Sequence, residues 1–278
     1  MKRAFQVIGI CAFTCFSFYY TNKAVDIAKS KDPIMKTINE LEDKEIKSVN
    51  AIINEDTIKS GVSGKKIDKK KSYEKMKALG KYNENLLFFE EVTPDISIKN
   101  NYDKFVIGGN ELEKNITLCF IIKDTKYINE ILKVLNNSKI KINFFIEGKL
   151  IEEDNSLLEL IIKNKQYASS YGYDGIYDDT LIKYANSLIY KYGHYINKYC
   201  YGNNKDTLKT CGYNNMYTIK GIEVDENYPY TFVKNNLNNG AILTFSNTKE
   251  QVRNLDLIIK YIKSKGYSVK DLDNLLTE

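Results

Sequence analysis

Residues 139–148 read KIKINFFIEG, and this stretch indicates the fold class. Its apolar segment, 140–146, is typical of a buried strand, and residues 151–163 carry apolar side chains at helical spacing. The same unit recurs on both sides. Further strands are predicted at 116–122, 166–169, 195–201, 216–221 and 240–245, and further helices at 127–136, 180–192, 205–211 and 251–265. Alternating strands and helices favour a parallel α/β sheet or barrel, whose chemistry lies at the carboxyl ends of the strands.

Composition excludes several classes of function. The chain has 278 residues and a net charge of +5 from 41 basic and 36 acidic residues. That charge is too small to indicate a nucleic-acid partner, so none is expected. His194 is the single histidine, which excludes a zinc site built from two or three histidines.

The N-terminal segment predicts a membrane anchor. Lys2 and Arg3 precede the apolar run 5–20, FQVIGICAFTCFSFYY, and no small-residue cleavage signal follows it. We expect residues 1–22 to form an uncleaved signal-anchor helix in the cytoplasmic membrane, with the bulk of the chain extracytoplasmic. A cleaved signal peptide and a buried N-terminal helix are the alternatives.

Residues 23–112 are predicted to form an extracytoplasmic connecting segment. Apolar residues recur at helical intervals over 24–58, which predicts a stalk helix. A lysine-rich stretch (59–81) and short strands within 86–108 follow, and residues 82–112 could pack on the barrel or stand apart. Cys200 and Cys211 could pair in an oxidising compartment or remain free thiols.

The order of motifs resembles the polysaccharide deacetylase (NodB-homology) family over residues 113–278. The segment 139–148 matches the family's second-strand signature K-x-K-A-T-F-F-V-x-G, and 240–248 with 258–267 matches its last strand and helix. Tyr201-Gly202 fits the fifth unit. The resemblance implies an irregular (β/α) barrel of the NodB type, preceded by the anchor, the helical stalk and a short β-rich segment.

The same resemblance implies that the catalytic residues are missing. Members of the family hold a divalent metal with one Asp and two His, and use a second Asp as base and a late His as acid. The signature T-F-D-D-G falls on residues 119–123, H-G-Y-S-H on 171–175, R-P-P-Y-G on 198–202 and L-H-D on 245–247. The family positions are therefore occupied here by Ile121, Ile122, Tyr171, Gly175, Lys198 and Ser246. Isoleucine has no donor atom for a cation, so no metal and no other cofactor are expected.

Three functions remain open. The first is a pseudoenzyme that binds cell-wall glycan in the emptied cleft, through side chains that combine aromatic rings with polar groups. Its candidate residues are Asp124, Tyr171, Tyr173, Asp174, Lys198, Tyr201, Ser246 and Asn247. The second is an active amide hydrolase with a displaced site, for which Asp124, Asp174 and Asp178 are conceivable ligands. The third is a scaffold whose stalk and basic segment recruit an envelope protein partner.

Overall fold

The computed structural model describes residues 2–278, with side chains described from residue 13 onward, and it divides into two compact units. The N-terminal unit comprises Gly64–Val92 together with the chain up to Lys47. The larger unit comprises Ser48–Ser63 and Thr93–Glu278.

The N-terminal unit packs short helices on a two-stranded antiparallel sheet. Its elements are α1 (Lys2–Ser30), α2 (Pro33–Asn39), η1 (Glu42–Lys44), β3 (Gly64–Ile67), α3 (Lys69–Leu79), η2 (Glu84–Leu86) and β4 (Phe89–Val92). Asp32 begins α2, because its carboxylate accepts the Ile34 N–H at 2.9 Å and Pro33 suits the first helical position. The same carboxylate binds the Lys77 ammonium at 2.7 Å, which ties α2 to α3.

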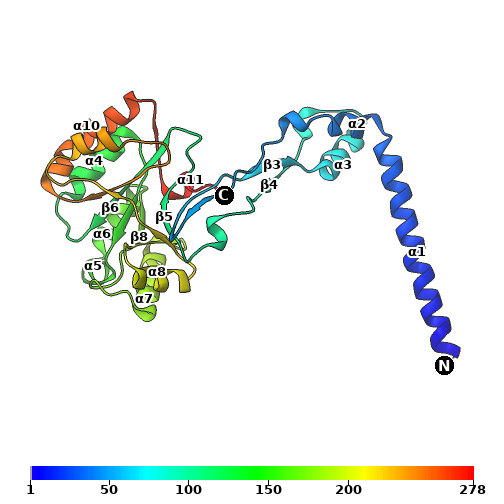
Figure 1. Ribbon diagram of the computed structural model, residues 1–278, viewed down its shortest axis with the longest axis horizontal. Helices are drawn as coiled ribbons and strands as arrows, with labels where there is room; N and C mark the ends of the chain where they lie inside the picture. The colour runs from blue at the N-terminus through cyan, green and yellow to red at the C-terminus, as the bar shows by residue number, and fades with distance from the viewer. Residues whose placement is uncertain (1) are drawn as a thin grey trace. The chain divides into compact units, whose positions relative to one another are not determined.

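The larger unit is a curled, mostly parallel sheet surrounded by helices (Figure 1). The strand order is β1-β2-β5-β10-β9-β8-β7-β6-β12-β11, with β13 also paired to β6. An isolated antiparallel bridge links Gly108 on β5 to Ala241 before β12, two strands that are not neighbours in the sheet order. The predicted α/β architecture is therefore confirmed, and its sheet is curled into a half-barrel.

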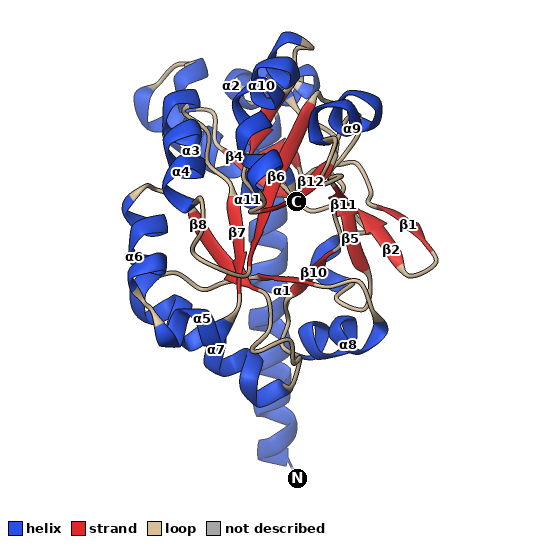
Figure 2. Ribbon diagram, turned by 90° about the vertical axis from the view of Figure 1, so that its left-hand side faces the viewer, coloured by secondary structure: helices blue, strands red, loops and turns tan. Residues whose placement is uncertain are grey.

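From β6 onward the larger unit follows the predicted order of strands and helices, with two differences (Figure 2). The helix predicted at 151–163 is divided into α5 and α6, and β11, α9 and α11 were not predicted. Its strands are β1 (Ile52–Asn54), β2 (Thr57–Lys59), β5 (Phe105–Gly108), β6 (Asn115–Ile122), β7 (Asn143–Ile146), β8 (Tyr167–Ser170), β9 (Tyr199–Tyr201), β10 (Tyr217–Ile219), β11 (Ile222–Glu223), β12 (Ile242–Ser246) and β13 (Ser268–Lys270). Its helices are η3 (Ile98–Asn100), α4 (Ile128–Ser138), α5 (Gly148–Glu153), α6 (Ser156–Lys163), α7 (Asp179–Gly193), α8 (Lys205–Tyr213), α9 (Pro229–Asn236), α10 (Lys249–Ser264) and α11 (Leu272–Leu275).

Two cores lie on opposite faces of the sheet. Along β6, Phe120 and Ile122 pack with the helix-side cluster, whereas Cys119 and Ile121 pack with the interior cluster. The division follows from the two-residue period of a strand. Only every second side chain of β6 can therefore face the barrel interior.

The predicted stalk helix over 24–58 is wrong. Helix α1 ends at Ser30, α2 covers only Pro33–Asn39, and β1 and β2 form an antiparallel hairpin that joins the main sheet. Glu55 makes the turn with φ of 51°. Among the apolar residues that suggested this helix, those up to residue 39 are helical, whereas Ile46 and Val49 form isolated antiparallel bridges. Both are β-branched and suit extended backbone equally well.

Residues 82–112, which could pack on the barrel or stand apart, do both. Strand β4 pairs with β3 inside the N-terminal unit, whereas β5 pairs in parallel with β10 and β2 in the larger unit. The segment is therefore divided between the units.

No helix within the described part of the chain is both long and apolar enough to cross a membrane. The side chains of residues 2–12, which make up much of the predicted anchor, lie outside those described. The anchor therefore stays a prediction.

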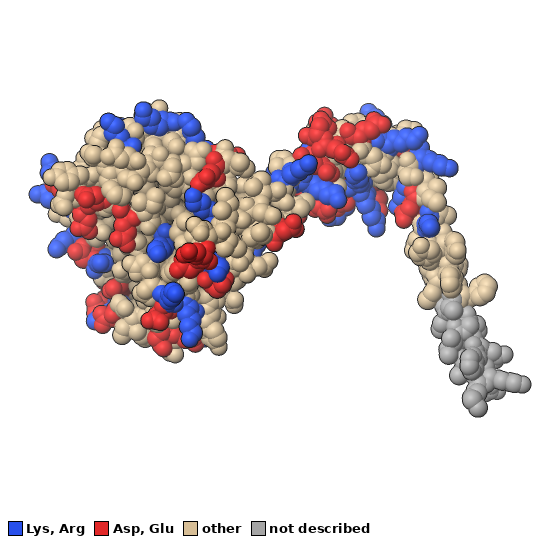
Figure 3. Space-filling view, in the orientation of Figure 1, with Lys and Arg blue, Asp and Glu red and all other residues tan. Residues whose placement is uncertain are grey.

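On the visible face of the larger unit, basic and acidic side chains are interspersed (Figure 3).

Candidate functional site: a tyrosine-lined cleft at the strand ends

A cleft of about 790 Å³ lies at the carboxyl ends of the strands of the larger unit. Loops after β6, β7, β8 and β9, together with β11 and β12, supply its walls. The lining residues are Ile121, Lys123, Glu147, Tyr171, Gly175, Tyr177, Tyr201, Gly202, Asn203, Asn204, Thr207, Glu223, Val224, Asp225, Glu226, Thr244, Phe245 and Ser246. In a parallel α/β fold this is the end at which ligands bind.

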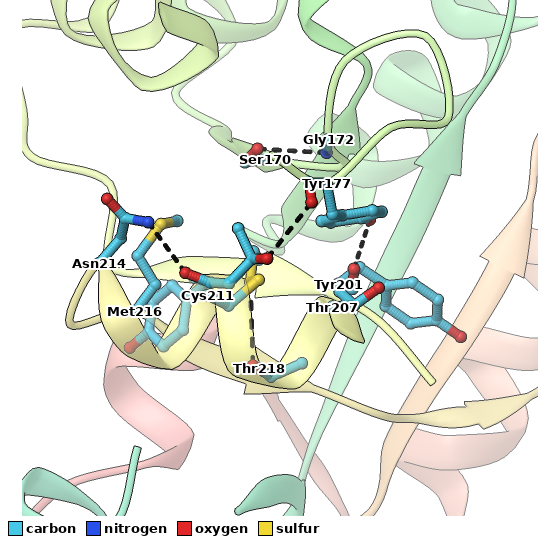
Figure 4. The surroundings of a disulfide bond; sticks show 12 residues. Ser170, Gly172, Tyr177, Tyr201, Thr207, Cys211, Asn214, Met216 and Thr218 are labelled. Atoms are coloured by element: carbon cyan, nitrogen blue, oxygen red, sulfur yellow. Dashed lines mark hydrogen bonds between the residues drawn. A yellow bond between two sulfur atoms is a disulfide. The ribbon is translucent and has the colours of Figure 1, made fainter. Parts of the chain in front are cut away.

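Three tyrosines form an aromatic wall. The Tyr171 ring lies 5.9 Å from the Tyr201 ring and 6.5 Å from the Tyr177 ring, measured between centroids. The Tyr177 hydroxyl donates to the Tyr201 carbonyl at 2.5 Å, which joins the loop before α7 to the end of β9 (Figure 4). Burial raises the pKa of both Tyr177 and Tyr201, so both phenols stay protonated at neutral pH.

A disulfide supports this wall from behind. Cys200 on β9 and Cys211 on α8 are bonded, with their Cα atoms 6.4 Å apart (Figure 4). The pairing that the sequence left open is therefore formed. Because Tyr201 follows Cys200 directly, the bond ties the strand that carries the aromatic wall to the helix beside it.

Charged groups face the cleft from both sides of the aromatic wall. The Tyr201 hydroxyl donates to the Glu223 carboxylate at 2.9 Å. The Lys123 ammonium lies 6.0 Å from the centroid of the Tyr171 ring, a cation–π geometry. Glu147, which follows β7, is half-buried; burial, and after it the negative charge of Asp174, raises the pKa of its carboxyl group.

Several residues predicted for the cleft do meet there. Ile121, Tyr171, Gly175, Tyr201 and Ser246 all line it. Four of these occupy positions where the family carries catalytic or metal-binding groups, so the cleft coincides with the family's site as placed by the motifs. Ile121 is 8% exposed and offers only hydrocarbon at the end of β6.

Three predicted residues from the first and last strands lie elsewhere. Ile122 is fully buried among the helix-side residues, because it alternates with Ile121 along β6. Asp124 and Asn247 meet each other instead, and the Asn247 amide donates to the Asp124 carboxylate at 2.8 Å. Neither side chain lines the cleft.

The remaining three predicted residues do not line the cleft either. Asp174, at a left-handed φ of 50°, binds the Lys149 ammonium at 3.0 Å, and the Tyr173 hydroxyl donates to Glu152. Lys198 precedes β9 at the opposite end of the strands and lies 3.5 Å from the Asp273 carboxylate. Lys198 therefore cannot orient a group in the cleft.

The site does not fit the metal that the family uses. The described residues contain no group of three or more His, Cys, Asp or Glu side chains positioned to hold an ion. The conceivable displaced site is also dispersed. Asp124 binds Asn247, Asp174 binds Lys149, and Asp178 accepts the Thr180 N–H at 2.8 Å as the cap of α7. His194, the single histidine, follows α7 as its C-cap; it is exposed and has φ of 57°.

Sequence reasoning missed Glu147, Tyr177 and Glu223. Glu147 follows the strand of the signature stretch directly, so a strict reading of strand ends would have included it. Tyr177 comes from the loop before α7, and Glu223 lies on a strand of two residues that has no readable pattern. These two are found only from the structure.

Solved structures share this fold. A carbohydrate esterase family 4 (CE4) pseudoenzyme of Bacillus anthracis, BA3943, superposes with a TM-score of 0.68 at 21% identity, covering 89% of this chain and 96% of its own. Bacillus subtilis PdaA, a family 4 carbohydrate esterase, superposes with a TM-score of 0.57 at 20% identity, covering 64% of this chain and 86% of its own. The chain has the NodB-type deacetylase fold.

Sequence comparison adds one long match to this NodB-type fold. The uncharacterized protein YlxY of Bacillus subtilis strain 168 is 24% identical over an alignment covering 91% of this chain and 86% of YlxY. No family model matches the sequence. A mutant of BA3943 with restored enzymatic activity also superposes, with a TM-score of 0.68 at 22% identity over 89% of this chain and 99% of its own.

Proposed function

We propose that this chain is a catalytically inactive deacetylase-like protein whose cleft binds glycan of the cell envelope. The observation that carries the proposal is the cleft itself. It lies where the sequence motifs place the site of the resembled family, it has an aromatic wall, and its described residues form no group that could hold a metal. Aromatic walls with a few convergent polar groups suit the alternating apolar and hydroxyl surfaces of a sugar.

Support for inactivity comes from chemistry at the strand ends. A metal-dependent deacetylase needs an ion to activate water and a base to accept its proton. Ile121 and Ile122 occupy the positions of the two carboxylates, and neither can perform either task. The likeness to BA3943, described as a pseudoenzyme, agrees with this proposal.

We further propose that residues 1–22 hold the protein at the cytoplasmic membrane, with residues 23–278 outside. The Cys200–Cys211 disulfide supports an extracytoplasmic location, since such bonds persist in oxidising compartments. The full chain should sediment with membranes and resist carbonate extraction, whereas a chain lacking residues 1–22 should remain in the supernatant. Equal behaviour of the two chains would refute the anchor.

Acetate release and glycan binding test the proposal together. The full chain is incubated with acetylated chito-oligomers and with peptidoglycan, in excess zinc or cobalt and in chelator, beside an active deacetylase. We expect no acetate release but measurable binding by calorimetry. Tyr171→Ala should weaken binding about ten-fold, whereas Tyr213→Ala, which removes a tyrosine that is 77% exposed outside the cleft, should not. Chelator-sensitive acetate release would overturn the assignment.

A further inference from the structure

The charge of the cleft is strongly one-sided. Four carboxylates line the cleft, against one ammonium group, that of Lys123. The carboxylates are those of Glu147, Glu223, Asp225 and Glu226. The chain as a whole has a net charge of +5, so the acidic cleft does not follow from composition.

The aromatic wall of the cleft already receives a cation. The Lys123 ammonium lies 6.0 Å from the centroid of Tyr171, over the face of the ring. This ring face therefore attracts a primary ammonium group, and an aliphatic amine of a ligand that displaces the Lys123 ammonium can take the same kind of position.

The wall of the cleft also holds an unused hydrogen-bonding group. Thr244 is 2% exposed, and although it lies beside the Tyr201 phenol, its hydroxyl makes no hydrogen bond of standard geometry among the described residues. Thr244 lines the cleft directly beside Phe245 and Ser246. Buried hydroxyls are normally paired, so the hydrogen-bonding capacity of this one remains for the Tyr201 phenol beside it or for a ligand that reaches the wall.

From these three observations we propose that the cleft selects glycan carrying free amino groups: a de-N-acetylated amino-sugar oligomer bound as its ammonium form. The inference rests on the proposed glycan-binding function and names the class of glycan. It reverses the preference of a deacetylase, because the ligand has the chemistry of that reaction's product. A preceding amide hydrolysis must supply it.

Electrostatics gives the reason for the preference. A sugar ammonium forms charge-assisted hydrogen bonds with Glu147 and Glu223, which are roughly twice as strong as neutral ones. A neutral N-acetyl group offers these carboxylates one uncharged N–H donor, so it compensates their desolvation less well. The ligand's charge should affect Glu147 most, because burial and the negative charge of Asp174 already disfavour the charged form of its carboxyl group.

Binding of two matched oligomers to the full chain tests the inference. Glucosamine and N-acetylglucosamine oligomers of equal length are titrated by calorimetry at slightly acid pH and low salt. We expect the free-amine oligomer to bind about ten-fold more tightly and to lose that advantage at high salt.

Charge-removing variants assign the preference to the cleft. Glu147→Gln and Glu223→Gln should each weaken binding of the free-amine oligomer several-fold while leaving the N-acetylated oligomer unchanged or tighter. Glu159→Gln removes the same charge from the exposed surface of α6 and should change neither affinity. Melting temperatures of all variants establish that they are folded.

Each outcome decides a separate point. Equal or tighter binding of the N-acetylated oligomer overturns this inference and leaves the proposed glycan binding in place. Binding of neither oligomer overturns both. A preference for the free amine that survives Glu147→Gln and Glu223→Gln also overturns it, because the carboxylates would then not be its cause.

Discussion

The Tyr201 phenol at the end of β9 donates a hydrogen bond of 2.9 Å to the carboxylate of Glu223 on β11, two strands that are not neighbours in the sheet. Strand β9 pairs with β8 and β10, and β11 pairs with β12. The bond therefore spans the cleft and holds its two sides together.

Tyr201→Phe removes this bond and keeps the ring. Because Tyr201 is 3% exposed, the change should lower the free energy of unfolding by about 1 kcal/mol, the usual net value of one hydrogen bond. Urea unfolding monitored by circular dichroism measures the effect. Tyr213→Phe, at an exposed position on α8, is the matched control and should have no effect; a fully neutral Tyr201→Phe would contradict a structural role for the bond.

Removal of the disulfide should loosen the same wall. Cys200 and Cys211 are 11 residues apart, and a closed loop of this size stabilises a protein by up to about 3 kcal/mol. We expect Cys200→Ala with Cys211→Ala, and equally the reduced wild-type protein, to melt at lower temperature. Cys119→Ala serves to separate a disulfide effect from a cavity effect, since Cys119 is a buried free thiol. An unchanged melting temperature after verified reduction would refute the role of the bond.

Restoring a family carboxylate at the end of β6 should harm the fold. Ile122 is fully buried on the helix side, so Ile122→Asp places a carboxylate in hydrocarbon and should cost about 4 kcal/mol or more, against about 1 kcal/mol for Ile122→Val. Denaturant unfolding with and without zinc measures this cost. Recovery of stability by zinc would mean that neighbouring groups can complete a metal site, contrary to the arrangement described above.

The strand and helix order after residue 115 could be predicted because local and tertiary signals agree there. Residues 143–146 form β7 and are buried on both faces of the sheet. The segments with amphipathic spacing form the helices α4, α6 and α10. Where the local and tertiary signals conflict, the prediction is wrong. Residues 52–58 were assigned to the stalk helix, but pairing of β1 with β2, and of β2 with β5, decides their conformation.

Cleft residues could be predicted from the sequence only where the ends of the strands were predicted correctly. Tyr171 and Ser246 extend directly from β8 and β12, so motif alignment placed them in the cleft. Lys198 was misplaced because β9 has only three residues and begins after it. Asp174 was misplaced because a positive φ turns its loop toward Lys149, which no sequence pattern shows.

The raised pKa of Glu147 predicts opposite pH dependences for stability and for binding. A carboxyl group whose folded pKa lies above its ordinary value of 4.5 favours the folded state most when protonated, so its contribution to stability declines as pH rises from 4.5 through the raised value. Affinity for a free-amine oligomer should change the other way and fall as pH drops through that window, because a neutral carboxyl no longer attracts an ammonium group.

Calorimetry in two buffers of different ionisation enthalpy checks this coupling. Because a bound ammonium favours the charged carboxylate, binding should release a fraction of a proton from wild-type protein within the window. Glu147→Gln should abolish the release and flatten both pH profiles, whereas Glu159→Gln should keep them. Proton uptake on binding, or an identical profile for Glu147→Gln, would show that Glu147 does not face the ligand's charge.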